Sequence, residues 1–511
     1  MFAVSAGALP KLGLVAAACL AGVVIIAQRA RIRALAMLGA LVLAPVLLLD
    51  EIWSSPQVTT LHRHALVVAV GGLVALAAVG LVAWLFARRP QWIAPVAVAA
   101  LPFRIPIQSG GSASNLLVPL YFVVAAAALS WIVPVLYRSA SSRRSERRRP
   151  PHRFEQCLAL VVVLYAVQAT YSPGFEKALQ NVVFFYVPFA LLFALLRDLD
   201  WDQPMQTRCL VVAGVEAVIF ALSGYAEDIT HTVFLNPKLV AANDLHAYFT
   251  VNSVFFDPDI FGRFLALVMI LLVAVLVYDK RRPKVLASAG VLAVLWGGLV
   301  LTLSRSSLGA LLVGMAILAA MRWRRTRTVL AVGVALLAIG GIVVAITPRT
   351  FGLNQGLNGA SSGRANLVSG GVSMFGSEPL LGYGSGDFTN EYQKRDPQAA
   401  AVVSASHTIP VTIGAEQGLI GLLPYVALVL SALVVLFRSA RGDPARAAMA
   451  AAFAALILHT LLYADFLEDP VTWTLLGVGS AFTARHADEE ERAKRNKRQE
   501  RRAYWEKALA G

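Results

Sequence analysis

Long apolar stretches recur along almost the whole chain of 511 residues, with short polar segments between them. Many of these stretches approach the roughly 20 residues that an α-helix needs to cross a bilayer. Their apolar residues are continuous rather than alternating, which favours helices over the strands of a membrane β-barrel. Composition agrees, because only 15% of the residues are charged, against about 25% in a soluble domain. We therefore predict an all-α integral membrane protein, a polytopic bundle of about 13–15 transmembrane helices with two long external loops.

The division of the chain follows from these stretches and from the segments that separate them. The stretches that we expect to span the membrane are residues 12–27, 34–49, 65–87, 92–101, 115–137, 156–169, 175–196, 209–224, 259–278, 285–303, 307–321, 329–346, 409–437, 447–462 and 471–483. They form N-terminal transmembrane helices (1–224), a first long external loop (225–258), central transmembrane helices (259–346), a second long external loop (347–408), C-terminal transmembrane helices (409–484) and a basic cytoplasmic tail (485–511).

The basic residues show which ends of the helices face the cytoplasm. Most of the 45 Lys and Arg residues fall in every second connecting segment, including 280–284, 322–327 and the tail. Short loops rich in Lys and Arg stay in the cytoplasm. We therefore place the tail inside and the two long loops outside. The formal net charge of +15 then reflects membrane orientation, and we expect membrane lipids and no nucleic acid as partners.

Arg305 interrupts an apolar run in the stretch VLTLSRSSLGALLVG. Basic segments flank residues 284–321 on both sides, so both ends of this segment are expected in the cytoplasm. As one helix it would be about twice as long as the hydrocarbon layer is thick. We therefore predict a helical hairpin with its turn at Ser304–Ser307, which places Arg305 at the outer interface rather than at the membrane centre.

Several cationic side chains are expected at the same outer face. They are Arg104, Arg263, Arg305, Arg364 and His407. Arginine binds phosphate through a planar fork and keeps its charge, so such a group suits a lipid-linked diphosphate. Each residue also has a structural interpretation. Asp259 and Arg263 lie four residues apart and suit an ion pair on one helix face, Arg305 suits an interfacial snorkelling arginine, Arg364 suits a solvated loop charge, and His407 suits a hydrogen-bonded interfacial histidine.

Other ionisable residues give weaker signals. Asp257 and Asp259 form a D-x-D pair, but two carboxylates alone are a poor metal site, and we expect neither a metal nor a cofactor. Glu216 and His459 fall within apolar stretches, where ionisable groups are functional by default. A neutral, hydrogen-bonded side chain between helices explains either residue equally well.

Three blocks of sequence resemble the O-antigen ligase and O-antigen polymerase superfamily of bacterial membrane glycosyltransferases. The first is VNSVFFDPDIFGRFLALVMILL and the second is LTLSRSSLGALLVGM. The third is GRANLVSGGVSMFGSEPLLGYGSGDFTNEY, followed by SASHTIPVTIGAEQGLIGLLPYV. The resemblance covers roughly residues 252–425. The chain departs from the family pattern at Asp259, where Asn is usual, and at Thr408, where Asn or Ser is usual.

The resemblance implies a metal-independent, inverting transfer of a glycan from a polyprenyl-diphosphate donor at the external face of the bacterial cytoplasmic membrane. Arg263, Arg305 and Arg364 would then hold the diphosphate, and His407 would orient or deprotonate the acceptor hydroxyl. The residues expected to bind substrate around them are Arg104, Ser304, Ser306, Asp259 and Glu416. Glu416 also suits a bracing role inside the bundle. The acceptor would be a glycan, a lipid or a protein.

Other functions fit parts of the pattern. A glycan polymerase shares these motifs with a ligase, and the sequence does not separate the two, although we favour the ligase. A transporter or flippase of lipid-linked sugars would need polar groups along a path near mid-membrane, where only Glu216 and His459 stand out. A scaffold or sensor would not need Arg and His residues to converge at one face.

Overall fold

The structure is a computed structural model, and it describes residues 7–52, 65–109, 112–137, 149–233, 243, 249–323, 327–328, 364–397, 406–438 and 440–510. Its helices and strands are α1 (Ala8–Ile26), α2 (Ala30–Ile52), α4 (Ala65–Arg88), η1 (Pro90–Trp92), α5 (Ile93–Ala100), β1 (Ile105–Ser109), β2 (Ser112–Leu116), α6 (Val118–Tyr137), α7 (Arg153–Ala169), α8 (Phe175–Asn181), η3 (Val182–Tyr186), α9 (Val187–Asp198), α10 (Gln203–Thr230), α12 (Pro258–Tyr278), α13 (Arg282–Leu301), α14 (Arg305–Trp323), α17 (Arg364–Ser377), α18 (Phe388–Arg395), α19 (Ile409–Phe437), η5 (Ala440–Gly442), α20 (Pro444–Leu462) and α21 (Pro470–Ala510).

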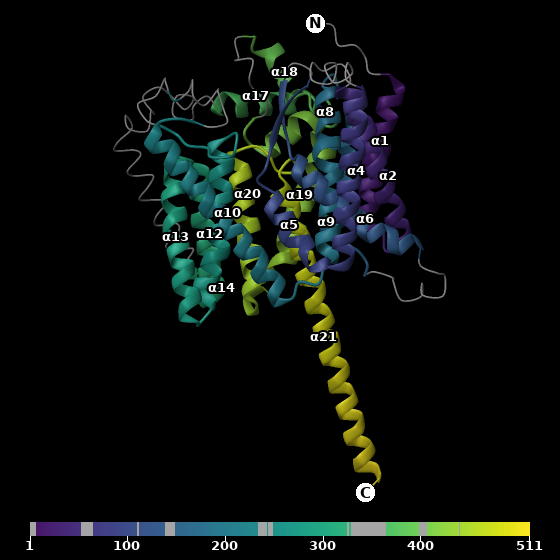
Figure 1. Ribbon diagram of the computed structural model, residues 1–511, viewed down its shortest axis with the longest axis vertical. Helices are drawn as coiled ribbons and strands as arrows, with labels where there is room; N and C mark the ends of the chain where they lie inside the picture. Colours follow the sequence, from purple (N-terminus) through teal and green to yellow (C-terminus); the bar gives the residue numbers. More distant parts are fainter. Residues whose placement is uncertain are drawn as a thin grey trace.

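The long helices stand side by side in one bundle (Figure 1). Within the described residues, 11 helical segments are long and apolar enough to cross a membrane. The prediction of an all-α polytopic membrane protein is confirmed, with one small antiparallel hairpin of β1 and β2 beside the helices. We call the end of the bundle that carries α17 and α18 in Figure 1 the upper end, and the end where α21 leaves it the lower end.

Some predicted spans take a different form in the structure. Residues 92–101 form mainly the eight-residue α5, which is too short to cross a bilayer. Residues 156–169 lie in α7, which has 17 residues and is shorter than the roughly 20 that a span needs. Residues 471–483 begin α21, a single helix of 41 residues that continues without a break through the predicted tail. The predicted span 329–346 lies outside the described residues.

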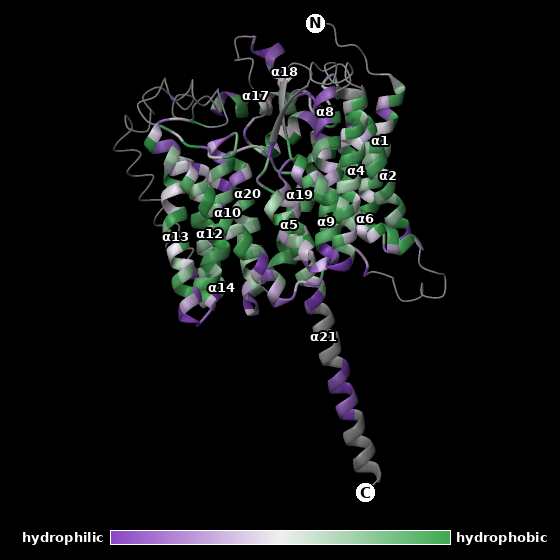
Figure 2. Ribbon diagram, in the orientation of Figure 1, coloured by the Kyte–Doolittle hydropathy of each residue, from purple (hydrophilic) through white to green (hydrophobic). Residues whose placement is uncertain are grey.

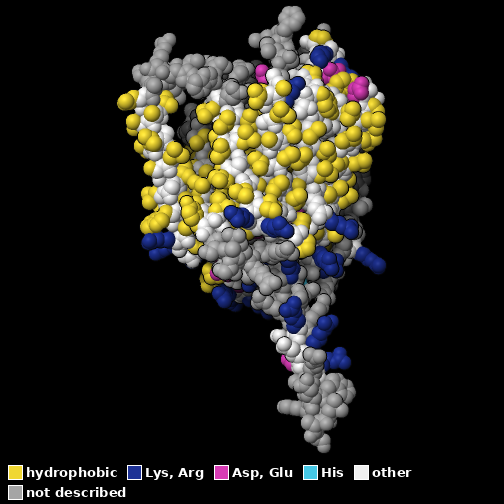
Figure 3. All heavy atoms as spheres, turned by 90° about the vertical axis from the view of Figure 1, so that its right-hand side faces the viewer, with side chains coloured by type: hydrophobic (Ala, Val, Ile, Leu, Met, Phe, Trp, Pro, Cys, Tyr) yellow, Lys and Arg dark blue, Asp and Glu magenta, His cyan; other side chains and the backbone are white. Residues whose placement is uncertain are grey.

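Burial distinguishes central helices from peripheral ones. Of the most apolar part of each helical segment, 89% is buried inside the protein in Phe175–Asp198, 67% in α12 and 61% in α20, but only 6% in the segment Val68–Arg88 of α4. Apolar residues cover most of the bundle, and hydrophilic residues gather at its two ends and in the tail (Figure 2). The space-filling view shows a broad belt of hydrophobic side chains, with most of the visible Lys and Arg side chains below it (Figure 3). The peripheral helices therefore present the surface that contacts lipid.

Asp-Pro pairs set the starts of three helices. The side chain of Asp257 accepts hydrogen bonds from the backbone N–H groups at the start of α12, Asp443 does the same for α20, and the Asp469 side chain accepts one from Val471 at the start of α21. An aspartate is a favoured N-cap, and proline suits the first turn because its missing N–H would have no helical partner there. Asp257 and Asp469 lie beside the candidate site described below, so these caps also fix its position.

Helix α19 is broken at Gly418, where φ is +60°. A Cβ atom there would lie 2.3 Å from the carbonyl oxygen of Leu380, so only glycine fits this close approach. Residues 379–386 run beside the break, and the backbone N–H of Gly384 donates to the carbonyl oxygen of Glu416 over 2.8 Å. The glycine-rich segment before α18 is thereby held against the first half of α19.

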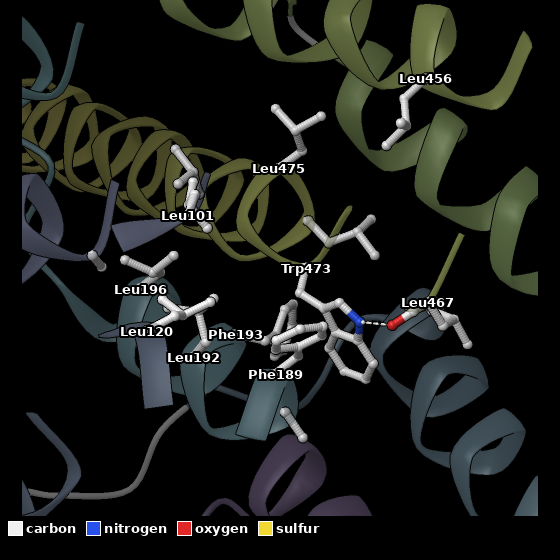
Figure 4. Close-up of a cluster of buried hydrophobic side chains, with 14 of the residues drawn as sticks. Leu101, Leu120, Phe189, Leu192, Phe193, Leu196, Leu456, Leu467, Trp473 and Leu475 are labelled. Carbon is white, nitrogen blue, oxygen red and sulfur yellow. Dashed lines mark hydrogen bonds between the residues drawn. The ribbon is translucent and has the colours of Figure 1, made fainter. Parts of the chain in front are cut away.

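A short acidic loop, residues 463–469, joins α20 to α21 at the upper end. Trp473 of α21 is fully buried, and its indole N–H donates to the carbonyl oxygen of Leu467 over 2.9 Å. The indole packs among side chains that include Phe189 and Phe193 of α9 (Figure 4). This anchor fixes the loop to the central helices.

Candidate active site

A serine cluster occupies the turn between α13 and α14, at the position predicted for the hairpin turn. The hydroxyl of Ser304 donates to Asp259 Oδ1 over 2.5 Å, and that of Ser306 donates to the same oxygen over 3.0 Å. Nε2 of His459 lies 3.2 Å from the hydroxyl oxygen of Ser306 and 3.1 Å from that of Ser307. The start of α12, the start of α14 and the end of α20 are thus joined by one buried polar network.

Arg364 reaches this network from the start of α17. Its guanidinium lies 3.4 Å from Asp259 Oδ2 and donates to the carbonyl oxygen of Leu462 over 3.1 Å. The alternative that Asp259 pairs with Arg263 is therefore wrong. The side chain of Arg364 remains 40% exposed, so it is anchored on one side and open to a ligand on the other.

Arg263 lies deeper and is held by the acidic loop. Its side chain is 2% exposed, and its Nη2 lies 2.7 Å from Asp469 Oδ2. Its Nη1 donates to the carbonyl oxygen of Asp465 over 2.9 Å. Because its charge is already neutralised by a buried carboxylate, these contacts give Arg263 a role in holding the loop in place.

His407 lies immediately before α19, in a left-handed backbone conformation with φ of +57°. Its ring centroid is 5.6 Å from that of Tyr463, and its Nδ1 has no hydrogen-bond partner within the described part of the chain. Burial and the nearby charge of Arg364 lower the pKa of His407 below its ordinary 6.5, with Asp259 and Asp465 opposing the shift. The imidazole is therefore neutral at pH 7, and a neutral imidazole accepts a proton.

Asp257 is a second ionisable group, linked to His407 through Tyr463. It caps α12, and the Tyr463 hydroxyl donates a hydrogen bond to its carboxylate. Burial, with the neighbouring charge of Asp259, raises the pKa of Asp257 to about 6. Through Tyr463, this carboxylate is linked to the ring that lies against His407.

Arg305 begins α14 with its side chain exposed. Within the described residues, no hydrogen bond or ion pair of this side chain is found. Its neighbours Ser304 and Ser306 are instead buried in the serine cluster. The turn thus directs its hydroxyl groups inward and leaves the Arg305 side chain exposed beside them.

Arg104 and Glu416 line a cavity that residues 464–468 of the acidic loop also line. The Glu416 side chain is 7% exposed and accepts hydrogen bonds from the backbone N–H groups of Gly386 and Phe388 over 2.9 and 3.2 Å. This geometry matches the bracing role considered for Glu416. Glu216 lies apart on α10 and has no contact with these groups among the described residues.

No group of three or more His, Cys, Asp or Glu side chains that suits a metal ion occurs among the described residues. The functional groups that the sequence did not single out are Tyr463, Asp465, Glu468 and Asp469. They come from the short stretch YADFLED between two apolar helices, and its density of carboxylates was the available signal.

The fold and this site together define a multi-pass membrane protein with arginine and histidine side chains gathered at one end. Residues 290–426 match the sequence model of the O-antigen ligase family. The matched segment includes Arg305, Arg364, His407 and Glu416. This segment is therefore similar to a family of membrane enzymes that transfer glycans, in agreement with the resemblance that its motifs indicated. No curated protein matches the chain.

Proposed function

We propose that this protein transfers a glycan from a polyprenyl-diphosphate donor to an acceptor hydroxyl at the external face of the bacterial cytoplasmic membrane, as an O-antigen ligase does. The observation that carries the proposal is the placement of a neutral His407 next to Arg364. Both lie close to the turn between α13 and α14 (the serine turn, Ser304–Ser307), where the Arg305 side chain is exposed. This arrangement supplies a base and fixed positive charge at one place.

The reaction is a single displacement. His407 accepts the proton of the acceptor hydroxyl while the acceptor oxygen attacks the anomeric carbon of the donor sugar. The bond from that carbon to the phosphate oxygen breaks, and polyprenyl diphosphate leaves with the electron pair. Attack from the face opposite the leaving group inverts the anomeric centre. A histidine base of this kind contributes about 10²–10⁴-fold to a rate.

The developing charge on the diphosphate needs stabilisation, and Arg305 and Arg364 supply it without a metal ion. Asp259 and the carbonyl oxygen of Leu462 hold Arg364 in place before substrate arrives. Preorganised positive charge in a partly dry site costs little reorganisation during the reaction. Arg263 has an indirect role, because its guanidinium holds the acidic loop that carries Asp465 in position.

The distribution of basic residues supports an external site. On the face shown in Figure 3, most Lys and Arg side chains lie below the hydrophobic belt and along the tail. Because segments rich in Lys and Arg stay in the cytoplasm, this distribution supports a cytoplasmic lower end. The upper end, with the serine turn and His407, then faces outward, where the acceptor would be a glycan, a lipid or a protein.

The test is release of polyprenyl diphosphate by the purified protein in nanodiscs. The donor is a polyprenyl-diphosphate-linked oligosaccharide, and a panel of candidate acceptors is supplied with and without EDTA. The variants are Arg305→Ala and His407→Gln. Arg322→Ala is the matched control, because Arg322 occupies the opposite end of the same helix α14. Thermal unfolding of each variant shows whether it has folded.

Loss of release in both site variants, with normal release in Arg322→Ala and in EDTA, supports the proposal. Unchanged release in His407→Gln refutes the assignment of the base, and loss of release in EDTA redirects attention to Asp257 and Asp259. Product length separates the two transfer reactions, since a ligase moves the glycan once and a polymerase produces a ladder.

A further inference from the structure

A cavity of about 250 Å³ lies beside His407 and outside the serine cluster. Its walls come from α7, from the α8–η3 segment, from the first half of α19 and from residues 464–468 of the acidic loop. Ile409, two residues after His407, lines it. Asp465 also lines it and acts electrostatically on His407. The acidic loop therefore borders both the cavity and His407.

One wall of the cavity carries an unused hydrogen-bond acceptor. Asn181 is 7% exposed, and its side-chain amide donates to the hydroxyl oxygen of Tyr165 over 2.8 Å. Its Oδ1 is buried and has no partner among the described residues. A buried carbonyl oxygen without a donor is costly, so a ligand that brings an O–H or N–H group to this position would be stabilised.

The remaining lining combines aromatic rings with charges of both signs. Phe184, Tyr186 and Phe466 contribute rings, and the Tyr186 hydroxyl donates to Glu468 over 3.0 Å. The charged lining residues are Arg104, Lys177, Glu416, Asp465 and Glu468. A phosphate site would present an excess of cations, which this lining lacks. Apolar ring faces beside hydrogen-bonding groups suit a sugar, whose ring has apolar C–H faces and a hydroxyl-bearing edge.

We propose that this cavity is a glycan subsite that binds an uncharged sugar unit bearing hydroxyl or acetamido groups, with Asn181 Oδ1 as the acceptor for one of its donors. The sugar belongs to the donor or to the acceptor of the transfer reaction, so this inference rests on the proposed function. The cavity holds the sugar next to His407, while the diphosphate is bound at the serine turn.

The experiment measures binding rather than turnover. The full-length protein in nanodiscs is titrated with chitotriose, maltotriose, trigalacturonate and pyrophosphate, and saturation-transfer NMR reports contact. Chitotriose or maltotriose should bind saturably, and trigalacturonate and pyrophosphate should not compete with it. Asn181→Leu should weaken that binding about tenfold, which is the effect of losing one good hydrogen bond. Ile413→Trp fills the cavity without altering Asn181, and it should abolish the binding.

The controls separate this inference from the proposed function. His407→Gln should bind the neutral sugar as the wild type does, although it is expected to lose turnover. Absence of binding by both neutral sugars, or binding that both cavity variants leave unchanged, overturns the glycan subsite. Binding of pyrophosphate that displaces the neutral sugars also overturns it. Absence of turnover in the wild type with normal sugar binding refutes the proposed function alone.

The turnover assay distinguishes the two sources of the sugar. In the turnover assay, a neutral trisaccharide that raises the KM for the acceptor occupies the acceptor's position. One that raises the KM for the lipid-linked donor occupies the donor's glycan position. Either result is consistent with a glycan subsite beside His407.

Discussion

Replacing Arg263 by methionine is expected to destabilise the protein rather than to remove a substrate contact. The Arg263 and Asp469 side chains are 2% and 5% exposed, and their charged atoms lie 2.7 Å apart. Removing one partner of such a buried pair leaves a charge without compensation, which costs about 3–5 kcal/mol. The upper part of that range is expected, because the carbonyl oxygen of Asp465 also loses its donor.

A double-mutant cycle tests this reasoning. Asp469→Asn should cost about 3 kcal/mol, at the lower end of the same range, because it leaves the Arg263 charge without its counter-charge while the amide oxygen can still accept a hydrogen bond and asparagine still caps α21. The double variant Arg263→Met with Asp469→Asn leaves no buried charge. Its loss of stability should fall about 2 kcal/mol or more below the sum of the two single losses.

The assay is equilibrium unfolding in mixed micelles with increasing SDS, followed by tryptophan fluorescence. Release of polyprenyl diphosphate is measured on the same purified preparations, before SDS is added. The reasoning would be refuted if Arg263→Met had the same midpoint of SDS unfolding as the wild type and yet lost all turnover. That result would make Arg263 a direct ligand of the diphosphate, as the sequence motifs suggested.

Three further outcomes are expected. His407→Gln should lower kcat by about 10²–10⁴-fold with an unchanged unfolding midpoint, and an unchanged kcat would exclude His407 as the base. For the wild type, kcat/KM should decline as pH falls through a value below 6.5, because protonation of His407 removes the base. A decline centred above 6.5 would contradict the assignment. Trp473→Phe should cost about 1–3 kcal/mol, because the carbonyl oxygen of Leu467 loses its donor, and wild-type stability in mixed micelles would show that this bond does not anchor the acidic loop.

Local sequence signals were enough to predict the membrane fold and the turn at Arg305. Continuous apolar runs identify helices, and the basic segments on both sides of residues 284–321 require a hairpin. The motifs around Arg305, Arg364 and His407 were enough to indicate the similarity to O-antigen ligases, because these motifs follow one another along one stretch of chain.

The partners of these residues were not predictable in the same way. Asp469 lies more than 200 residues after Arg263, and only the packing of α12 against α20 and the acidic loop brings the two side chains together. The i and i+4 spacing of Asp259 and Arg263 favoured the wrong pair, since tertiary contacts outcompeted the local one. The sequence did not predict the break in α19 for a related reason. Gly418 lies within an apolar stretch, and its φ of +60° is fixed by the backbone of residues 379–386.

Helix α21 connects the site to the far side of the bundle. It has 41 residues, so at 1.5 Å per residue it is a rod about 60 Å long. One end is clamped, since Asp469 both caps its first turn and binds Arg263. The other end extends beyond the lower end of the bundle (Figure 1). Such a rod connects the acidic loop beside His407 to the tail, so a spectroscopic label on the tail would report whether the two ends move together when substrate binds.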